Sequence, residues 1–217
     1  MTTIAILGGT GHEGAGLGLR WAKTGHAILI GSRAAEKAQA AAAEINAKLG
    51  VDSVRGLDNL AAAQAASVVV LTVPYSAHTA TIESVREAVQ SKIFVDVTVP
   101  LVPPKVSRVQ MPAAGSASQE AQNLLGPNVK VVTAFQNIGA EHLKDPAHPI
   151  DCDVLVCGDD KDAKAVVIQL AADAGMKGWD AGPLANAVVA EGLTSVLIGL
   201  NQKHKLKAAG IRITGIG

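Results

Sequence analysis

The chain has 217 residues, enough for one large domain or for one domain with a small appended lobe. Its 19 Lys and Arg residues balance 19 Asp and Glu residues, and aromatic residues make up 2% of the chain. Because this composition offers neither a basic surface nor aromatic stacking platforms, we expect no nucleic-acid partner. No apolar segment runs uninterrupted for the roughly eighteen residues of a membrane span, so we expect no membrane partner either.

The start of the chain and its cysteines bear on the cellular compartment. The sequence runs directly into an apolar segment at 3–7, without the basic region or cleavage site of a secretory signal. Cys152 and Cys157 fit neither a CxxC motif nor a disulfide framework, so we expect reduced thiols, with Cys157 in a strand. These features predict a cytoplasmic protein.

Short apolar segments alternate with Ala-rich helical segments along the chain. Strands are predicted at 3–7, 27–30, 53–55, 67–72, 93–97, 129–134 and 154–157. Helices are predicted at 14–23, 34–49, 57–66, 75–89, 116–125 and 161–174, and four prolines mark a loop at 98–115. Because this alternation is typical of parallel β-α-β units, we predict an α/β fold with a Rossmann-type, doubly wound parallel sheet.

The C-terminal part ends in a long apolar helix, predicted at 184–207. An apolar helix of this length indicates either a fully buried helix or an oligomer interface. We place it in a small C-terminal lobe, residues 148–217, after a larger Rossmann domain of residues 1–147. The alternative is one continuous domain, because His148-Pro149 is a weak boundary signal.

A glycine motif follows the first predicted strand and opens the first predicted helix. Gly9-Thr10-Gly11-His12-Glu13-Gly14 fits the pattern G-x-G-x-x-G. In this pattern the first glycine permits a tight turn, the second lets a pyrophosphate approach the backbone, and the third lets helix and strand pack closely. The motif therefore predicts a dinucleotide on the helix N-terminus, with a ligand-free glycine turn as the alternative.

The end of the second predicted strand indicates which dinucleotide binds. An NAD site usually has an acidic residue here for the ribose 2′-hydroxyl, whereas this chain reads Gly31-Ser32-Arg33. Arg33 and Ser32 are suited to phosphate, and Lys37 lies four residues further along the same helix start. These groups predict the 2′-phosphate of NADP, and an ordinary solvated basic surface is the alternative.

Seven segments spread over nearly the whole chain carry a family resemblance. They read GGTGHEGAGLGLRWAKTGHAILIGSRAAEKA (8–38), LTVPYSAHTATI (71–82), VDVTVPL (95–101), GSASQEAQNLLG (115–126), DVLVCGDD (153–160), DAGPLANA (180–187) and LTSVLIGLNQKHK (193–205). Together they resemble the F420-dependent NADP oxidoreductases, in a bacterial-type member. The resemblance implies direct hydride transfer between C4 of nicotinamide and C5 of the deazaflavin F420. Such a step depends on ring positioning and needs no catalytic side chain.

The resemblance also implies a set of binding residues. The implied NADP contacts are Gly9, Thr10, Gly11, His12, Glu13, Ser32, Arg33, Lys37, Val73 and Pro74, with the backbone of Ile138, Gly139 and Ala140 at the carboxamide. The implied F420 pocket contains Thr98, Val99, Pro100, Leu101, Gln136 and Thr194, together with residues 211–213. We also expect a homodimer formed through the long C-terminal helix.

Three positions depart from the archaeal pattern of this family, in which His, Arg and Ser face F420. This chain has Gln136, Val188 and Gly192 there, and it retains Thr194. Two other functions therefore stay open: NADPH-dependent reduction of another organic acceptor on the same scaffold, and a non-catalytic NADP(H) sensor. The retained TVPL and LTSV segments favour an enzyme over a sensor.

No metal site is expected from the histidines and acidic residues. His142, Asp145 and His148 lie in a proline-containing loop, and their spacing fits no standard zinc site. The acidic segment 159–162 lacks the EF-hand spacing and is explained by helix capping. His78 lies one helical turn after Pro74, and a structural role there is favoured over a nucleotide contact.

Overall fold

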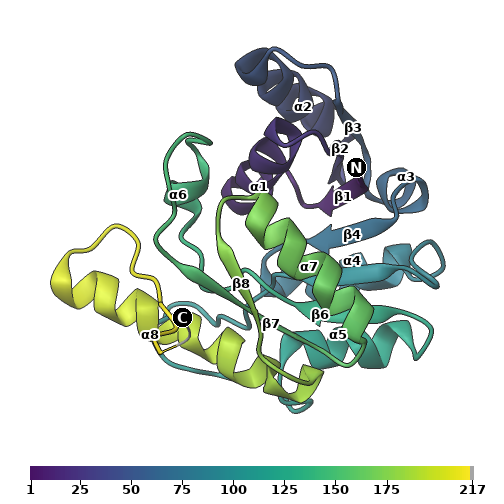
Figure 1. Cartoon of the computed structure of the whole chain (residues 1–217). Coiled ribbons are helices and arrows are strands. Elements are labelled where there is room, and N and C mark those ends of the chain that lie inside the picture. The colour runs from purple at the N-terminus through teal and green to yellow at the C-terminus, as the bar shows by residue number, and fades with distance from the viewer. Residues whose placement is uncertain (216–217) are drawn as a thin grey trace.

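An eight-stranded sheet runs through the molecule in the order β3-β2-β1-β4-β5-β6-β7-β8 (Figure 1). The computed structural model describes residues 1–215. The strands are β1 (Thr3–Leu7), β2 (Ala27–Ser32), β3 (Val54–Asp58), β4 (Val68–Leu71), β5 (Ile93–Asp96), β6 (Lys130–Thr133), β7 (Asp153–Gly158) and β8 (Lys177–Asp180). Neighbours are parallel except β6 and β7, which are antiparallel. The order 3-2-1-4-5-6 is that of a doubly wound sheet, so the predicted fold class is confirmed.

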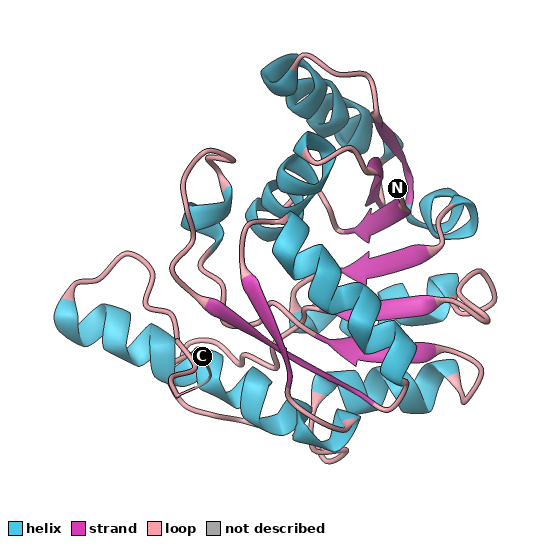
Figure 2. Ribbon diagram, in the orientation of Figure 1, coloured by secondary structure: helices cyan, strands magenta, loops and turns pink. Residues whose placement is uncertain are grey.

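Helices cover both faces of this sheet (Figure 2). They are α1 (His12–Lys23), α2 (Ala35–Leu49), α3 (Asn59–Ala65), α4 (His78–Val85), α5 (Ala117–Leu125), α6 (Ala140–Leu143), α7 (Lys161–Asp173) and α8 (Ala187–His204). Short 3-10 turns, η1 (Tyr75–Ala77) and η2 (Leu184–Asn186), precede α4 and α8. Apolar residues of α1, α2 and α7 pack on one face, and those of α3, α4 and α5 pack on the other.

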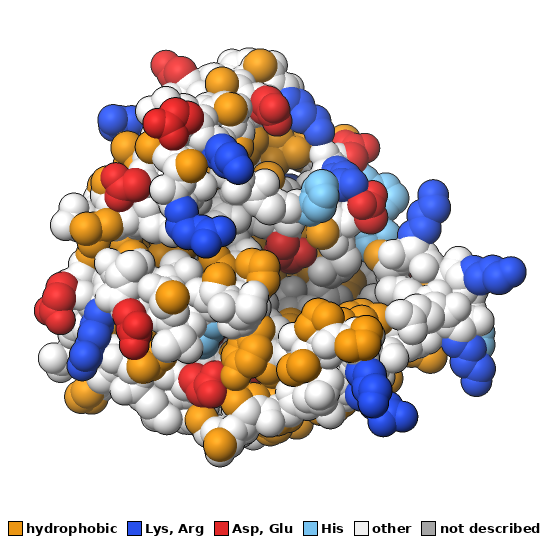
Figure 3. Space-filling model, turned by 180° about the vertical axis from the view of Figure 1, so that it is seen from behind, with side chains coloured by type: hydrophobic (Ala, Val, Ile, Leu, Met, Phe, Trp, Pro, Cys, Tyr) orange, Lys and Arg blue, Asp and Glu red, His pale blue; other side chains and the backbone are white. Residues whose placement is uncertain are grey.

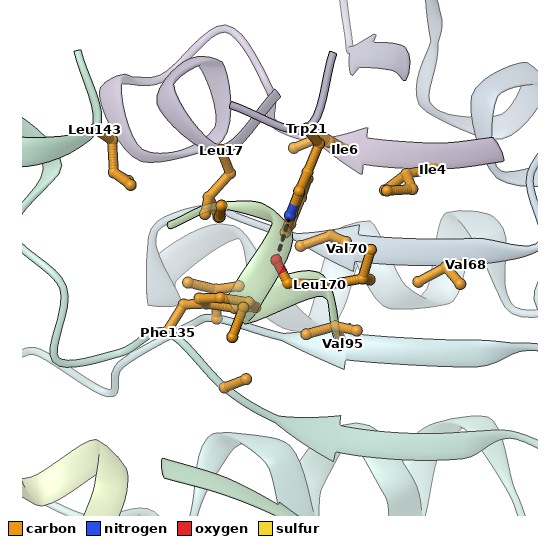
Figure 4. Close-up of a cluster of buried hydrophobic side chains, with 14 of the residues drawn as sticks. Ile4, Ile6, Leu17, Trp21, Val68, Val70, Val95, Phe135, Leu143 and Leu170 are labelled. Atoms are coloured by element: carbon orange, nitrogen blue, oxygen red, sulfur yellow. Dashed lines mark hydrogen bonds between the residues drawn. The ribbon is translucent and has the colours of Figure 1, made fainter. Parts of the chain in front are cut away.

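The strands are apolar along their length because both of their faces are buried. Ile4 and Ile6 of β1 face the α1 and α7 layer, whereas Ala5 and Leu7 face the opposite layer. Figure 4 shows the first layer, where Trp21 of α1 donates a hydrogen bond from Nε1 to the carbonyl of Leu170 in α7 at 2.7 Å. The buried indole therefore has the polar partner that it requires, and it joins two helices.

Several element boundaries differ from the sequence prediction. Helix α1 begins two residues early because Gly11, in extended conformation, is its N-cap. The predicted helix at 75–89 is a 3-10 turn followed by α4, which ends at Val85. Strand β8 and helix α6 were not predicted, because each has four residues and β8 carries Lys and Asp at its ends. Short edge elements of this kind lack a clear hydrophobic period.

The long C-terminal helix is partly exposed, so of the two alternatives, a fully buried helix or an oligomer interface, the first is excluded. Val189 and Val196 of α8 are 64% and 50% exposed, and Val188 and Leu200 are exposed as well. The segment Leu184–His204 contains an 18-residue stretch with a mean hydropathy of 1.4, and it is long and apolar enough to cross a membrane by length and composition. One such helix is weak evidence for a membrane span, because core helices of soluble proteins pass the same test.

The C-terminal region extends the central sheet. Strand β7 pairs with β6 and β8 pairs with β7, so residues after 148 contribute two strands to it. The division into domains of residues 1–147 and 148–217 stays a prediction.

Candidate functional site

A cleft of about 650 Å³ opens at the carboxyl ends of β1, β2, β4 and β5. This edge includes the point between β1 and β4 where the strand order reverses, and ligands of open α/β sheets bind at such points. The face shown in Figure 3 is hollowed, with hydrophobic side chains gathered along the rim of the hollow. The cleft is lined by Gly8, Thr10, Gly11, His12, Glu13, Ser32, Arg33, Asn59, Thr72, Val73, Pro74, Tyr75, Ser76, Ala77, Thr81, Val97, Thr98, Val99, Leu101, Pro103 and Val106.

The glycine loop is held tightly at its base and open at its tip. Gly8 and Gly9 donate their N–H groups to the carbonyl of Gly31 at 3.1 Å, which ties the loop to β2. A Cβ on Gly14 would lie 2.5 Å from Thr72 Oγ1, whereas a Cβ on Gly11 would have no neighbour closer than 3.5 Å. Gly14 therefore permits close packing, and Gly11 leaves room for a ligand beside the first turn of α1.

One detail of the predicted loop needs correction. The turn was assigned to Gly9, but the left-handed residue is Gly8, with φ of 76°. Gly9 is required for a different reason, because a Cβ there would lie 2.8 Å from the carbonyl oxygen of Ile6. Gly9 itself does not line the cleft, and Thr10, Gly11, His12 and Glu13 do.

Glu13 presents an unusual carboxyl group to the cleft. Burial raises the pKa of Glu13 to about 8, and its Oε1 atom has no hydrogen-bond partner among the described residues. A carboxyl group with this pKa is mostly neutral at pH 7. It therefore adds little repulsion toward an anionic ligand at the adjacent helix N-terminus.

The end of β2 carries basic side chains and lacks the acidic residue that is usual in an NAD site. Ser32 is largely buried, and its Oγ accepts a hydrogen bond from the N–H of Ala34 at 3.3 Å. Arg33 is exposed at the cleft, and Lys37 is exposed on the first turn of α2, outside the residues that line the cleft. The nearest carboxylate along the next strand, Asp58, accepts a hydrogen bond from Ala61 N at 2.8 Å and so caps α3.

Asn59 is a site residue that the sequence prediction missed. It lines the cleft at the start of α3, and its Oδ1 atom has no hydrogen-bond partner within residues 1–215. A Cβ on Gly31 would lie 2.8 Å from that oxygen, so the glycine at the end of β2 makes room for it. The signal that could have found Asn59 is its position directly after β3, at the carboxyl edge of the sheet.

The opposite side of the cleft is formed by the segment after β5. Thr98, Val99 and Leu101 line it, as do Val73 and Pro74 after β4. Pro100 is buried and does not line the cleft. The sequence prediction missed further lining residues on this side, namely Tyr75, Thr81, Pro103 and Val106.

The remaining predicted residues lie after β6, outside the lining of the cleft. Gln136 and Ile138 are buried, and Gly139 precedes α6, which begins at Ala140. Thr194 of α8 donates a hydrogen bond from Oγ1 to the carbonyl of Gln136 at 2.8 Å, so the structure brings these two predicted residues together. The Oε1 atom of Gln136 has no hydrogen-bond partner in the described part of the chain.

The C-terminal segment 211–213 is bound to Asp153, the first residue of β7. Asp153 donates its N–H to the carbonyl of Ile211 at 2.8 Å, and its Oδ2 accepts from the N–H of Ile213 at 2.7 Å. A Cβ on Gly139 would lie 2.5 Å from Cβ of Ala208, so the same segment also packs on the residues before α6.

His142 and His148 have structural partners, and the two cysteines are buried. His142 and His148 stack with ring centroids 5.6 Å apart, and their carbonyl oxygens accept hydrogen bonds from the Arg20 guanidinium at 2.8 Å. Within residues 1–215, no three His, Cys, Asp or Glu side chains are grouped to hold a metal ion. Cys152 and Cys157 are both free and buried, and Cys157 lies in β7 as predicted.

Comparisons with known proteins agree on one family. Residues 3–100 match the family described as NADP oxidoreductase coenzyme F420-dependent. A protein named F420-dependent NADP reductase from Methanocaldococcus jannaschii is 45% identical, over 98% of this chain and 98% of its own length. One of the same name from Methanothermobacter thermautotrophicus is 40% identical, over 98% of this chain and 95% of its own. A crystal structure from an Arthrobacter species, described as a candidate F420-dependent NADP reductase, is 27% identical with a TM-score of 0.82, over 99% of this chain and 100% of that chain.

Proposed function

The chain belongs to the F420-dependent NADP oxidoreductase family, and from this premise we propose that it transfers a hydride between NADP(H) and F420. One structural observation supports this function above the others. A single cleft joins the glycine loop and Arg33 to the segment Thr98–Leu101, so a nucleotide and a second flat ring have room to meet. A sensor would need the nucleotide side alone.

The nucleotide side fits NADP(H) in charge and in shape. The open position at Gly11 and the first turn of α1 suit the pyrophosphate, and Arg33 with Lys37 and Ser32 suits the 2′-phosphate. Asn59 Oδ1 offers an acceptor to the adenosine at the same end. The proposed NADP contacts are Gly9, Thr10, Gly11, His12, Glu13, Ser32, Arg33, Lys37, Asn59, Val73, Pro74, Ile138, Gly139 and Ala140.

The protein's part in the reaction is positioning. The two bound rings supply the hydride donor and acceptor carbons, and no side-chain nucleophile is needed. Thr98, Val99 and Leu101 form the wall that would orient the deazaflavin, and Gln136 Oε1 offers an acceptor beside Thr194. The apolar residues Val73, Val97 and Val106 would exclude water from the meeting point of the rings. The proposed F420 contacts are Thr98, Val99, Pro100, Leu101, Gln136, Thr194 and residues 211–213.

The test is an absorbance assay with the purified protein. F420 should bleach in its visible band when NADPH is added, and NADH at the same concentration should act much more slowly. If no bleaching occurs at high enzyme concentration while NADPH still binds, the protein reduces another organic acceptor or acts as a sensor. If the protein does not bind NADPH, the proposed function is wrong.

The proposed assembly is a homodimer in the cytoplasm. The exposed apolar residues Val189, Val196 and Leu200 lie on the same side of α8, since they are seven and four residues apart. Covering such a surface with a second copy removes it from water. The protein should elute as a dimer in light-scattering chromatography, and V196E should shift it to the monomer. Wild-type protein eluting as a monomer would contradict this role of α8.

A further inference from the structure

A fully buried His–Asp hydrogen bond lies behind the second side of the cleft. His78 of α4 and Asp96 at the end of β5 are both 0% exposed, and His78 Nε2 lies 2.7 Å from Asp96 Oδ2. Neither residue lines the cleft. The hydride transfer proposed above uses neither group, so the pair needs another explanation.

Asp96 uses its remaining polar atoms on the two segments that follow β5 and β6. Its Oδ1 accepts a hydrogen bond from the N–H of Thr98 at 2.9 Å. Its backbone carbonyl accepts one from Gln136 Nε2 at 2.6 Å. Because Thr194 in turn bonds to the carbonyl of Gln136, one connected set of bonds joins α4, β5, the segment after β6, and α8.

The segment that Asp96 holds is a long connection without regular secondary structure. Of the described residues, 97–116 form no helix or strand. Thr98 has one further bond, from Oγ1 to the carbonyl of Val73 at 3.4 Å, and Leu101 bonds to Val99 within the segment itself. Val97 donates its N–H to the carbonyl of Leu71 at 3.0 Å, and the carbonyl of Arg108 accepts a hydrogen bond from Ser195 Oγ at 3.3 Å. Between these two anchors, Thr98 holds the wall through its bonds to Asp96 Oδ1 and to Val73, and the bond to Asp96 is the shorter.

His78 keeps the carboxylate in place. Burial lowers the pKa of His78, but its bond to Asp96 and the charges of Asp96, Glu120 and Glu191 outweigh this and raise it. A raised pKa favours the imidazolium, and a charged partner makes a buried carboxylate tolerable. The hydrogen bond also fixes which oxygen faces His78, so the other oxygen faces Thr98.

We propose that Asp96, oriented by His78, is the positioning residue that fixes the wall Thr98–Leu101 and thereby the affinity for the second substrate. This inference rests on the proposed function for its substrate, but not for its geometry. His78 and Asp96 act through Thr98 and Gln136 and touch no reacting atom.

The chain contains a matched control for this pair. His26 Nε2 lies 2.8 Å from Asp173 Oδ2, between the start of β2 and the end of α7. This second His–Asp pair has the same two groups, is partly exposed at 9% and 22% of its side chains, and lies at the opposite end of the sheet from the cleft. A purely structural role for His78 and Asp96 predicts similar behaviour of the two pairs.

The experiment compares D96A, D96N, H78Q and D173A in the full chain. D96A should raise KM for F420 roughly tenfold and change the Kd of NADPH less than about twofold, because only one side of the cleft is displaced. D96N keeps an acceptor for the N–H of Thr98, so its KM for F420 should stay close to that of wild type. D173A should change neither constant. The proposal would be overturned if D96A changed KM for F420 and the Kd of NADPH equally. It would also be overturned if D96A and D173A had equal effects on KM for F420.

Hydrogen–deuterium exchange gives a readout that does not depend on F420. The amides of 97–106 should exchange faster in D96A and H78Q than in wild type, with the glycine loop unchanged. If wild type fails to reduce F420, the proposed function is wrong, and this exchange result still decides whether Asp96 positions the wall. Unchanged exchange at 97–106 would refute the positioning role. If D96A does not fold, H78Q takes its place in the comparison with D173A.

Discussion

The two sides of the cleft are built in different ways. On the nucleotide side, the groups proposed for the phosphates are a backbone loop and exposed cations, all within residues 8–37. The second side depends on buried side chains from four elements, joined through Asp96 and Gln136. The nucleotide side is therefore specified by a contiguous motif, whereas the second side is specified by packing between distant segments. Substitutions should accordingly have separable effects on the two substrates.

The largest expected effect separates NADP(H) from NAD(H). R33A should weaken NADPH binding roughly 10- to 100-fold, because a hydrogen bond to a charged group contributes about 1.5–3 kcal/mol. NADH binding and KM for F420 should change little, and binding titrations with both nucleotides measure this. R86A, which removes an exposed arginine after α4, is the control. An equal loss for NADPH and NADH would contradict the assignment of the 2′-phosphate to Arg33.

The next prediction concerns pH and Glu13. Because burial raises the pKa of Glu13 to about 8, the folded protein keeps this carboxyl protonated above the ordinary value of 4.5. Its contribution to stability is fully present below pH 4.5 and is lost as the pH rises through about 8. Above that pH the ionised carboxylate should repel the pyrophosphate, and the Kd of NADPH should rise by up to about tenfold per pH unit.

E13Q provides the control for this pH dependence. The glutamine stays neutral, so its NADPH affinity and its stability should show no transition near pH 8. KM for F420 should show no such transition in either protein, since Glu13 lies on the nucleotide side. A wild-type profile identical to that of E13Q would show that Glu13 does not titrate in this range.

The smallest effect distinguishes two glycines within one loop. G14A should destabilise the fold by about 1–3 kcal/mol, because its Cβ would lie 2.5 Å from Thr72 Oγ1 and 2.8 Å from Gly9 Cα. G11A should leave the melting temperature nearly unchanged and weaken NADPH binding, because its Cβ meets no protein atom closer than 3.5 Å. Thermal melts and nucleotide titrations test both variants. Equal destabilisation would mean that Gly11 is also a packing glycine.

The features predicted correctly from the sequence are those that a short local pattern encodes. The glycine motif, the missing acid after β2, and the alternation of strands and helices all act within short segments, and the fold class was confirmed. Even there, the left-handed turn lies at Gly8 and not at Gly9, because a motif does not report backbone angles.

The second side of the cleft could be predicted far less completely. The His78–Asp96 pair joins residues eighteen positions apart through a pairing that no helical or strand period marks. Thr98 was predicted from family resemblance, but the reason for its position lies in Asp96 Oδ1. Gln136 and Thr194 were predicted as neighbours of F420, whereas their hydrogen bond depends on how α8 packs beside the segment after β6.

The reversed direction of β7 has a practical consequence for handling this protein. Because β7 is antiparallel to β6, its first residue, Asp153, lies at the edge of the sheet where the parallel strands end. Asp153 binds the segment 211–213 there, while the chain before β1 starts at the opposite edge (Figure 1). An affinity tag at the C-terminus would therefore follow the segment 211–213, which the proposed function places against F420. A tag placed before Thr3 leaves that side free, and it is the better choice for kinetic work.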